Sequence, residues 1–132
     1  MTRVNLIPVE KLYDQHLLAE HREIKRIPNV IKSGKFHLDD IPKKYVLGKG
    51  HVKFFYDKLG FLHRRYLALY DECKKRGFAV ENYTSAFENL PENLCGDFEP
   101  DEDDIALNQS RIDEKWRDNF YRMCGKIVEK SK

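Results

Sequence analysis

The clearest hydrophobic pattern lies in the middle of the chain and predicts a helix from about Asp57 to Arg76. Apolar side chains recur there at spacings of three and four residues, which places them in one stripe on a helix surface. The stripe consists of Leu59, Leu62, Tyr66, Leu69, Tyr70 and Cys73. Asp57 is expected to cap the start of this helix, and Gly77 lies where a glycine commonly ends a helix in a left-handed conformation. The pattern therefore predicts one long, half-buried helix.

Two more helices are predicted, one on each side of the central helix. The first is expected to begin near Val9 and to end before Pro28, because proline disfavours a helical conformation in the residue that precedes it. The other is expected to begin at Pro100–Glu102 and to run to about Trp116. Turn-forming residues fill the long connections, and strand signals are short and scattered. We therefore expect an all-α fold: a compact single domain, residues 1–132, of three main helices with long connecting loops.

Composition and net charge narrow the class of protein. Hydrophobic residues make up 41% of the chain and charged residues 35%, with a net charge of +2, which argues against intrinsic disorder. No run approaches the roughly 18 apolar residues that a membrane span needs, and the first residues lack the pattern of a secretory signal. Three widely spaced cysteines argue against a disulfide framework and against a zinc site. We expect a protein with no membrane partner, in a reducing, cytoplasmic setting.

Basic residues are distributed unevenly and form short clusters. The clusters are Arg22/Lys25/Arg26, Lys43/Lys44, Lys49/Lys53, Arg64/Arg65 and Lys74/Lys75/Arg76. Such clusters with aromatic residues between them, here at 54–56, are compatible with nucleic-acid binding. They are equally typical of solvated helix faces, so charge alone leaves both interpretations open.

The acidic residues gather in one run, from Asp97 to Asp104. Its last part, 101–104, would occupy the first turn of the third predicted helix, where negative charge interacts favourably with the helix dipole. A metal site is the weaker interpretation, because consecutive residues on a helix point in different directions. Ile105 and Ile112, seven residues apart, are expected on one face of the same helix.

One face of the first predicted helix carries residues suited to chemistry. At about 100° per residue, His16, Glu20 and Glu23 share one strip, with Arg22 and Arg26 along one edge. The other edge consists of Tyr13, Leu17 and Ile24. The Glu23 carboxylate is thus expected between an apolar side and a cationic side. The ordinary alternative is an amphipathic helix with ion pairs between residues four apart.

Segments that match one protein family, in order and over almost the whole chain, are the strongest indication of function. They are Thr2–Leu6, Asp14–Leu17, Ala19-Glu20, Arg22-Glu23, Arg26, Leu47-Gly48, Gly50–Val52, Phe54–Leu59, Phe61-Leu62, Cys73, Lys75–Phe78, Gln109, Arg111, Asp113–Lys115 and Gly125-Lys126. On these segments the chain resembles the pyrimidine-dimer DNA glycosylases and AP lyases of the phage endonuclease V type. The resemblance implies an N-terminal segment threaded between the helices, and excision of UV-induced cyclobutane pyrimidine dimers with nicking of the abasic site. It also implies a monomer whose partner is double-stranded DNA containing pyrimidine dimers or abasic sites. Such a protein acts wherever that DNA is, including a host cell if a virus or phage encodes it.

The resemblance also implies the chemistry. In the family the initiating methionine is removed, and the α-amine of the next residue, here Thr2, attacks C1′ of the damaged nucleotide. An α-amine has an ordinary pKa of about 7.7–8.0, against about 10.4 for lysine, so much more of it is neutral at pH 7. The amine forms an imine with the sugar, and β-elimination then breaks the strand. Glu23 matches the carboxylate that stabilises the cationic imine and moves protons, and no metal or cofactor is required.

DNA-binding roles follow from the same resemblance. The residues concerned are Arg3, His16, Arg22, Arg26, Arg111, Lys115, Phe120, Tyr121 and Arg122. Phe120 and Tyr121 remain from a C-terminal recognition segment that holds more aromatic residues in the family. The alternative is that these two rings pack the tail against the core. The acidic run and a shorter, different segment at 33–44 are further departures from the family pattern.

Three other functions remain open from the sequence. The first is a related glycosylase and AP lyase with an altered lesion preference. The second is a helical DNA-binding protein without catalysis, which the basic clusters alone would allow. The third is a metal-dependent nuclease built on the acidic run. The presence of Thr2 together with Glu23 favours catalysis, because a protein that only binds DNA needs neither residue.

Overall fold

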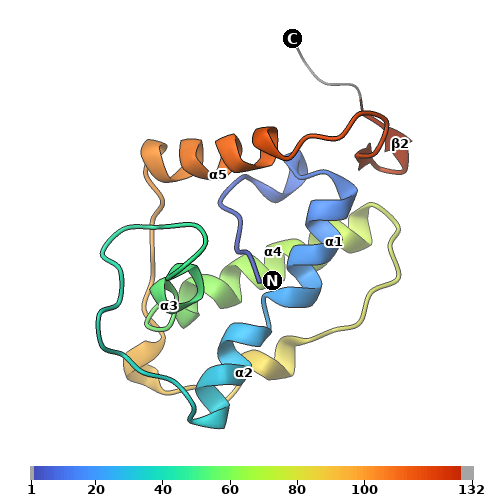
Figure 1. Ribbon diagram of the computed structural model, residues 1–132. Helices are drawn as coiled ribbons and strands as arrows, with labels where there is room; N and C mark the ends of the chain where they lie inside the picture. The colour runs from blue at the N-terminus through green and yellow to red at the C-terminus, as the bar shows by residue number, and fades with distance from the viewer. Residues whose placement is uncertain (1, 129–132) are drawn as a thin grey trace.

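Figure 1 shows the fold, a computed structural model that describes residues 2–128. Its α-helices are α1 (Asp14–Glu23), α2 (Arg26–Ser33), α3 (His51–Phe54), α4 (Leu59–Lys75) and α5 (Glu102–Glu114). Short 3-10 turns are η1 (Val9–Lys11), η2 (Thr84–Phe87) and η3 (Glu92–Leu94), and a hairpin of β1 (Arg122–Met123) and β2 (Lys126–Ile127) follows α5. The three longest helices, α1, α4 and α5, lie in the three predicted regions, and the predicted all-α class is confirmed. No helix within residues 2–128 is long and apolar enough to span a membrane.

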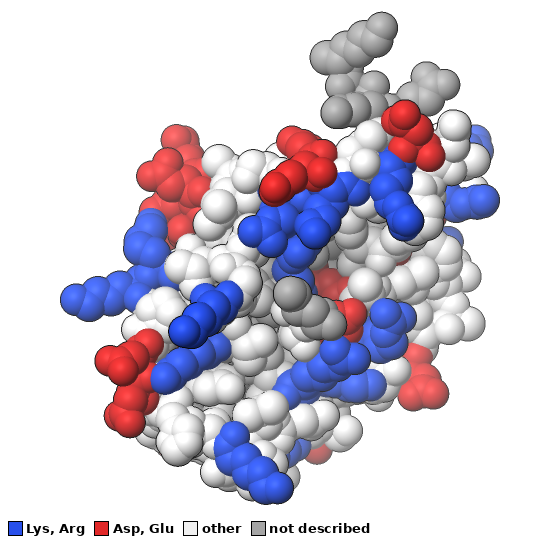
Figure 2. All heavy atoms as spheres, in the orientation of Figure 1, with Lys and Arg blue, Asp and Glu red and all other residues white. Residues whose placement is uncertain are grey.

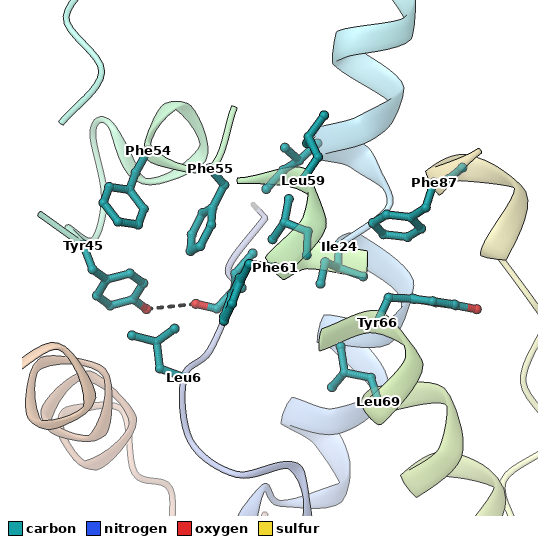
Figure 3. Close-up of a cluster of buried hydrophobic side chains, with 14 of the residues drawn as sticks. Leu6, Ile24, Tyr45, Phe54, Phe55, Leu59, Phe61, Tyr66, Leu69 and Phe87 are labelled. Atoms are coloured by element: carbon teal, nitrogen blue, oxygen red, sulfur yellow. Dashed lines mark hydrogen bonds between the residues drawn. The ribbon is translucent and has the colours of Figure 1, made fainter. Parts of the chain in front are cut away.

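The N-terminal segment runs through the middle of the molecule, between α1, α4 and α5 (Figure 1). Val4, Leu6 and Ile7 are buried there, and hydrogen bonds join the segment to side chains of α4 and α5. The predicted threading is therefore confirmed. The hydrophobic core forms around this segment (Figure 3).

The central helix α4 supplies much of the core, as its stripe predicts. Leu62, Tyr66 and Leu69 are completely buried, and α4 packs mainly against α1. At its C-terminus Gly77 has a φ of +84°, and its N–H donates to the C=O of Lys74 at 3.0 Å. These features confirm the predicted left-handed helix end.

The prediction that Asp57 caps α4 is wrong. The capping position belongs to Lys58, and the Asp57 carboxylate pairs with the Lys58 ammonium at 2.9 Å. The physical reason lies in a distant loop: the C=O of Gly96 accepts the Phe61 N–H at 3.2 Å, and the Gly96 N–H donates to the C=O of Asp57. A main-chain carbonyl thus satisfies a donor that a capping side chain would otherwise satisfy.

The predicted helix from Val9 to Pro28 is divided, and this boundary prediction is wrong. Val9 begins the 3-10 turn η1, α1 ends at Glu23, and α2 begins at Arg26 with Pro28 as its third residue. Proline is tolerated in the first turn of a helix, where its missing N–H has no partner to lose. In one continuous helix that N–H would face the C=O of Ile24, which here accepts from Ile27.

Helix α5 begins as the acidic run predicts. The Asp101 side chain accepts the Asp104 N–H at 2.8 Å, and the Asp104 side chain accepts the Asp101 N–H at 3.1 Å. The predicted first-turn position is confirmed for Glu102, Asp103 and Asp104, whereas Asp101 precedes the helix as part of a reciprocal cap that was not predicted. Of the two isoleucines expected on one face, Ile112 is buried and Ile105 is exposed. The inner face of α5 is largely polar, because Asn108 lies on it and is fully buried.

A small hairpin after α5 has no counterpart among the predicted elements. Its turn consists of Cys124 and Gly125, both with positive φ (52° and 85°). The buried Asp14 carboxylate accepts the N–H groups of both turn residues, at 2.9 and 2.7 Å. Arg76 at the end of α4 donates to the same carboxylate at 2.9 Å. Asp14 therefore fixes the hairpin to the start of α1 and the end of α4.

Candidate active site

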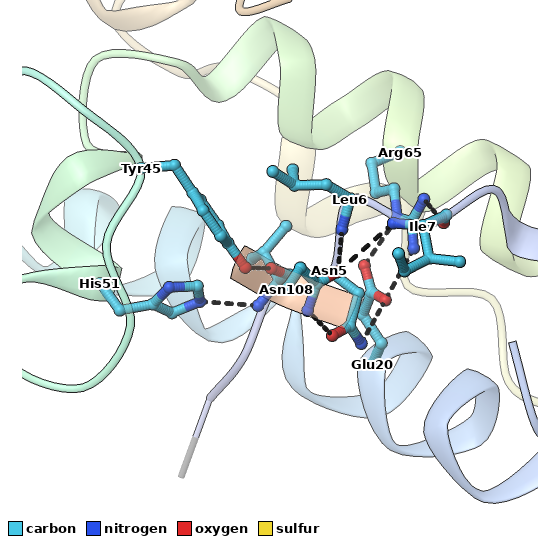
Figure 4. Close-up of polar contacts among 9 residues, drawn as sticks. Asn5, Leu6, Ile7, Glu20, Tyr45, His51, Arg65 and Asn108 are labelled. Atoms are coloured by element: carbon cyan, nitrogen blue, oxygen red, sulfur yellow. Dashed lines mark hydrogen bonds and ion pairs between the residues drawn. The ribbon is translucent and has the colours of Figure 1, made fainter. Parts of the chain in front are cut away.

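Among the described residues, Val4 makes the hydrogen bonds nearest to the N-terminus, and its partners His51 and Tyr45 are labelled in Figure 4. Its N–H donates to Nε2 of His51 at 2.8 Å, and the Tyr45 hydroxyl donates to its C=O at 2.9 Å. Nδ1 of His51 lies 2.8 Å from the C=O of Val46. Because Nε2 accepts a hydrogen bond, the proton of the neutral ring is on Nδ1 and points at Val46. Burial lowers the pKa of His51, which favours this neutral form.

Helix α5 holds the next part of the segment through Asn108. Its Oδ1 accepts the N–H of Leu6 at 2.7 Å and the N–H of Ile7 at 3.3 Å, and its Nδ2 donates to the Asn5 side chain at 2.9 Å. These bonds satisfy a fully buried amide, which would otherwise destabilise the fold. The N-terminal segment and α5 therefore fix each other.

A largely buried ion pair joins α1 to α4 beside the segment (Figure 4). Arg65 donates from Nε and Nη2 to the two carboxylate oxygens of Glu20, at 2.7 and 2.9 Å. Arg65 also donates to the C=O of Ile7, and the Asn5 amide donates to Glu20 at 3.0 Å. Both oxygens of Glu20 are thus engaged in holding structure together.

A pocket of about 180 Å³ opens beside the anchored segment. Its lining consists of Arg3, Asn5, His16, Ala19, Glu20 and Glu23. The strip predicted from helical spacing, His16, Glu20 and Glu23, therefore lines one pocket. Thr2 immediately precedes a lining residue, and consecutive Cα atoms lie about 3.8 Å apart.

Glu23 has the cationic neighbours expected of it, Arg22 and Arg26. Its carboxylate lies 3.7 Å from Nη2 of Arg22 and 4.0 Å from Nη1 of Arg26. The Glu23 side chain is 14% exposed, whereas those of Arg22 and Arg26 are 60% and 53% exposed. The carboxylate is thus held at the pocket while both guanidinium groups remain accessible to an anion.

His16 lies at the side of the same pocket, between two tyrosines. Its ring centroid is 5.7 Å from that of Tyr13 and 4.9 Å from that of Tyr121. Burial, with a further contribution from Arg3, lowers the pKa of His16. Its Nδ1 is buried and has no hydrogen-bond partner among the described residues.

The family model for pyrimidine dimer DNA glycosylases matches residues 1–85. The chain belongs to this family. The match includes the whole N-terminal segment and α1 to α4, and with them Thr2, Arg3, His16, Glu23 and His51. The protein is therefore a DNA glycosylase by family, and its substrate is DNA. Helix α5 and the hairpin lie outside the matched residues.

The two C-terminal aromatic residues predicted to bind DNA lie in different surroundings. Tyr121 is 5% exposed, stacks on Tyr13 at 5.2 Å and donates its hydroxyl to the C=O of Lys115 at 2.9 Å. Phe120 is 42% exposed, and the Arg117 guanidinium lies 4.7 Å from its ring centroid. The packing interpretation therefore describes Tyr121, while Phe120 presents an accessible ring.

The basic residues predicted to contact DNA form two groups. Arg3 lines the pocket, and Arg22 and Arg26 flank Glu23. The others are not among the lining residues and lie around the C-terminal end of α5 and in the hairpin; they are Arg111, Lys115 and Arg122. Figure 2 shows that Lys and Arg side chains surround the beginning of the described chain on one face, with acidic atoms visible between them. This face suits a polyanion.

Sequence reasoning missed the residues that anchor the N-terminal segment, above all His51, Arg65 and Asn108. His51 lies in the matched segment Gly50–Val52 but had no assigned role. No local signal could have found Arg65 and Asn108, since each acts on a residue far away in the chain; Asn108 and Leu6 are 102 positions apart. Within residues 2–128, no three His, Cys, Asp or Glu side chains gather in a way that could hold a metal ion. Asp101 and Asp104 of the acidic run bind each other's main chain and the Lys44 ammonium instead.

Proposed function

We propose that this glycosylase excises cyclobutane pyrimidine dimers and nicks the resulting abasic site through an imine formed by the Thr2 amine. The observation that carries the proposal is the pocket beside the fixed N-terminal segment, which both Arg3 and Glu23 line. An amine at the start of this segment would lie next to a carboxylate and exposed arginines. That combination suits attack on a sugar whose neighbouring groups are phosphates.

The proposed reaction needs only the amine, a carboxylate and water. After removal of Met1, the Thr2 amine attacks C1′, and the base leaves with the electron pair of the glycosidic bond and takes up a proton. The attached nitrogen then loses a proton, and its lone pair forms the C1′=N bond of the protonated imine as the C1′–O4′ bond breaks. The electron pair of that bond goes to O4′, which takes up a proton. Loss of a C2′ proton then expels the 3′ phosphate, and water hydrolyses the imine and releases the enzyme. Glu23 stabilises the cationic species and carries protons during ring opening and elimination.

DNA binding in this proposal rests on the basic residues around the pocket. Arg22 and Arg26 contact phosphates near the damaged nucleotide, because their guanidinium groups are exposed beside Glu23. Arg111, Lys115 and Arg122 contact the duplex farther away, and the protein acts as a monomer on double-stranded DNA. A dimer is poorly stacked, so extruding a nucleotide there costs less than in intact duplex, which gives selectivity with few base contacts.

The test is incubation with a duplex that contains one defined cyclobutane dimer, in EDTA and with borohydride. Borohydride reduces the imine and leaves a covalent protein–DNA complex. We expect that complex, and strand cleavage without borohydride, from protein that begins at Thr2. Protein that retains Met1 should bind the same DNA without forming the complex, because its Thr2 nitrogen is an amide.

Four other outcomes are possible, and each would contradict one part of the proposal. A covalent complex from the Met1-retaining form would exclude Thr2 as the nucleophile. Loss of cleavage in EDTA would favour a metal-dependent nuclease. Binding without cleavage by the processed form would indicate a DNA-binding protein without catalysis. Cleavage at abasic sites but not at dimers would indicate a different lesion preference.

A further inference from the structure

The hydrogen bonds of Val4 lie nearest to the N-terminus among those of the described residues. Thr2 and Arg3 extend from this anchor toward the pocket. A residue spans at most about 3.6 Å, so the Thr2 nitrogen lies within about 7 Å of the Val4 nitrogen. A small shift of the Val4 nitrogen therefore moves the Thr2 amine by a comparable distance.

We propose that His51 is a positioning residue for the Thr2 amine: its Nε2 fixes the Val4 N–H, and so sets the distance between the amine and the reacting sugar. The inference deepens the proposed function and rests on it. His51 does not line the pocket, so it acts only through the main chain of Val4.

Three observations give His51 this role rather than a general one in packing. The first is the short bond itself, 2.8 Å between Nε2 and the Val4 nitrogen. The second is the bond of Nδ1 to the C=O of Val46 at 2.8 Å, which selects the ring tautomer with an acceptor at Nε2. The third is the position of the ring, held edge-to-face between Tyr45 at 5.4 Å and Phe55 at 5.5 Å.

The supporting residues do not duplicate the contact to the Val4 N–H. The Tyr45 hydroxyl binds the C=O of Val4, and Asn108 binds the N–H groups of Leu6 and Ile7. These contacts fix the segment from the C=O of Val4 to Ile7, which is the part of the chain that leads to α1. Loss of the His51 acceptor would thus free the part of the chain that precedes Val4, with the remainder still held.

Two substitutions of His51 separate its two hydrogen bonds. In His51→Asn the amide nitrogen takes roughly the place of Nδ1, so the bond to Val46 is kept and the acceptor for Val4 is lost. In His51→Gln the side-chain oxygen takes roughly the place of Nε2, so the acceptor for Val4 is restored. The stability control is Phe87→Ala, since Phe87 is buried at the side of the core opposite Tyr45 (Figure 3).

The experiment measures the rate of borohydride trapping in a single turnover on an abasic-site duplex, with every variant processed to Thr2. It also measures the Kd for a duplex with a tetrahydrofuran abasic analogue, which cannot form an imine, and the Tm of each protein. A misplacement of about 1 Å costs roughly 100-fold in rate. We expect trapping to be about 10- to 100-fold slower in His51→Asn, within about threefold of wild type in His51→Gln, and unchanged in Phe87→Ala. The Kd should stay within about twofold throughout, because DNA binding does not depend on the amine.

Two results would overturn the positioning role. One is a trapping rate in His51→Asn equal to that of wild type. The other is a loss of rate in both His51 variants in proportion to their loss of Tm, with a similar loss of rate in Phe87→Ala. Wild-type protein that binds the duplex and forms no trapped complex would instead refute the proposed function, and the positioning role with it.

Discussion

Two carboxylates three residues apart on α1 line the same pocket and have different environments. Both oxygens of Glu20 are occupied by the buried Arg65, and the Glu20 side chain is essentially inaccessible. Glu23 has only long contacts, 3.7 and 4.0 Å, to arginines that are themselves exposed. Glu20 therefore serves the fold, and Glu23 remains available to a substrate.

This difference predicts opposite effects for the same substitution at the two positions. Glu23→Gln should keep its Tm and DNA affinity and lose strand cleavage by about 10²–10⁴-fold, the contribution expected of a general acid or base. Glu20→Gln should lower the free energy of unfolding by about 3–5 kcal/mol, because it leaves the buried Arg65 charge without its partner. Thermal unfolding, gel-shift binding and a nicking assay measure the three quantities. Cleavage by Glu23→Gln at nearly the wild-type rate would show that another group does this chemistry.

Phe120 and Tyr121 also differ in what their substitution should do. Phe120→Ala removes an exposed ring and should weaken binding to dimer-containing duplex by roughly 5- to 150-fold, the range of one base–aromatic stack, while abasic-site nicking and Tm stay unchanged. Tyr121→Ala removes a buried ring and should lower the free energy of unfolding by about 3–5 kcal/mol. If Phe120→Ala loses equal affinity for dimer-containing and for abasic-site duplex, the ring makes a general DNA contact.

For individual residues, the sequence predicted what helical spacing can encode. It brought His16, Glu20 and Glu23 to one strip, and they line one pocket. It could not show which of the two carboxylates is neutralised, because the partner of Glu20 lies 45 positions away on α4. The burial of Tyr121 was undecidable for the same reason, since the ring packs on Tyr13 of a distant segment.

In α4, a tertiary contact outweighs the helix propensity of one residue. Gly60 is the second residue of α4, and a glycine in a helix costs about 0.5–1 kcal/mol relative to alanine. A Cβ at this position, however, would lie 2.7 Å from the C=O oxygen of Cys95 and 3.0 Å from that of Gly96. Both oxygens belong to the loop that satisfies the start of α4, so neither can move freely.

We therefore expect Gly60→Ala to destabilise the protein by about 1–3 kcal/mol, the usual effect of overpacking, although helix propensity alone predicts a gain. Denaturant unfolding measures the change. A rise in stability would mean that the 95–96 loop moves away without cost, and that Gly60 has no packing role.

Element boundaries were predicted where the determinant is local and missed where it is not. Gly77 ends α4, and the acidic residues 102–104 begin α5, as the sequence indicates. The cap of α4 comes from Gly96, and the hairpin depends on Asp14, more than a hundred positions before its turn. Hydrophobic spacing also misjudges α5, because the residue that attaches it to the N-terminal segment is the polar Asn108.

For the whole molecule, buried histidines predict how stability depends on pH. Burial lowers the pKa of His16, His21 and His51 from the ordinary value of about 6.5. Near that pH the unfolded chain binds protons that the folded protein does not, so the free energy of unfolding should fall as pH is lowered from 7 through 6.5 toward 5.5. By about pH 8 the rings are neutral in the unfolded chain as well, so the three histidines give no further dependence above that pH.

Denaturant unfolding at pH 7.5, 6.5 and 5.5 measures this decline. The His51→Gln protein provides the control, since it lacks one of the three rings and should show a shallower decline. A free energy of unfolding that stays constant or rises toward pH 5.5 would contradict burial of the neutral rings.

The contact between Asn108 and residues 5–7 also has a consequence for synthesis. The ribosome makes Leu6 102 residues before it makes Asn108. At roughly 5–20 residues per second, that separation amounts to about 5–20 seconds. During this interval the nascent N-terminal segment has no α5 to bind, and enzymes that process new chains can reach it. The long separation thus gives time for maturation of the segment before the last helix encloses it.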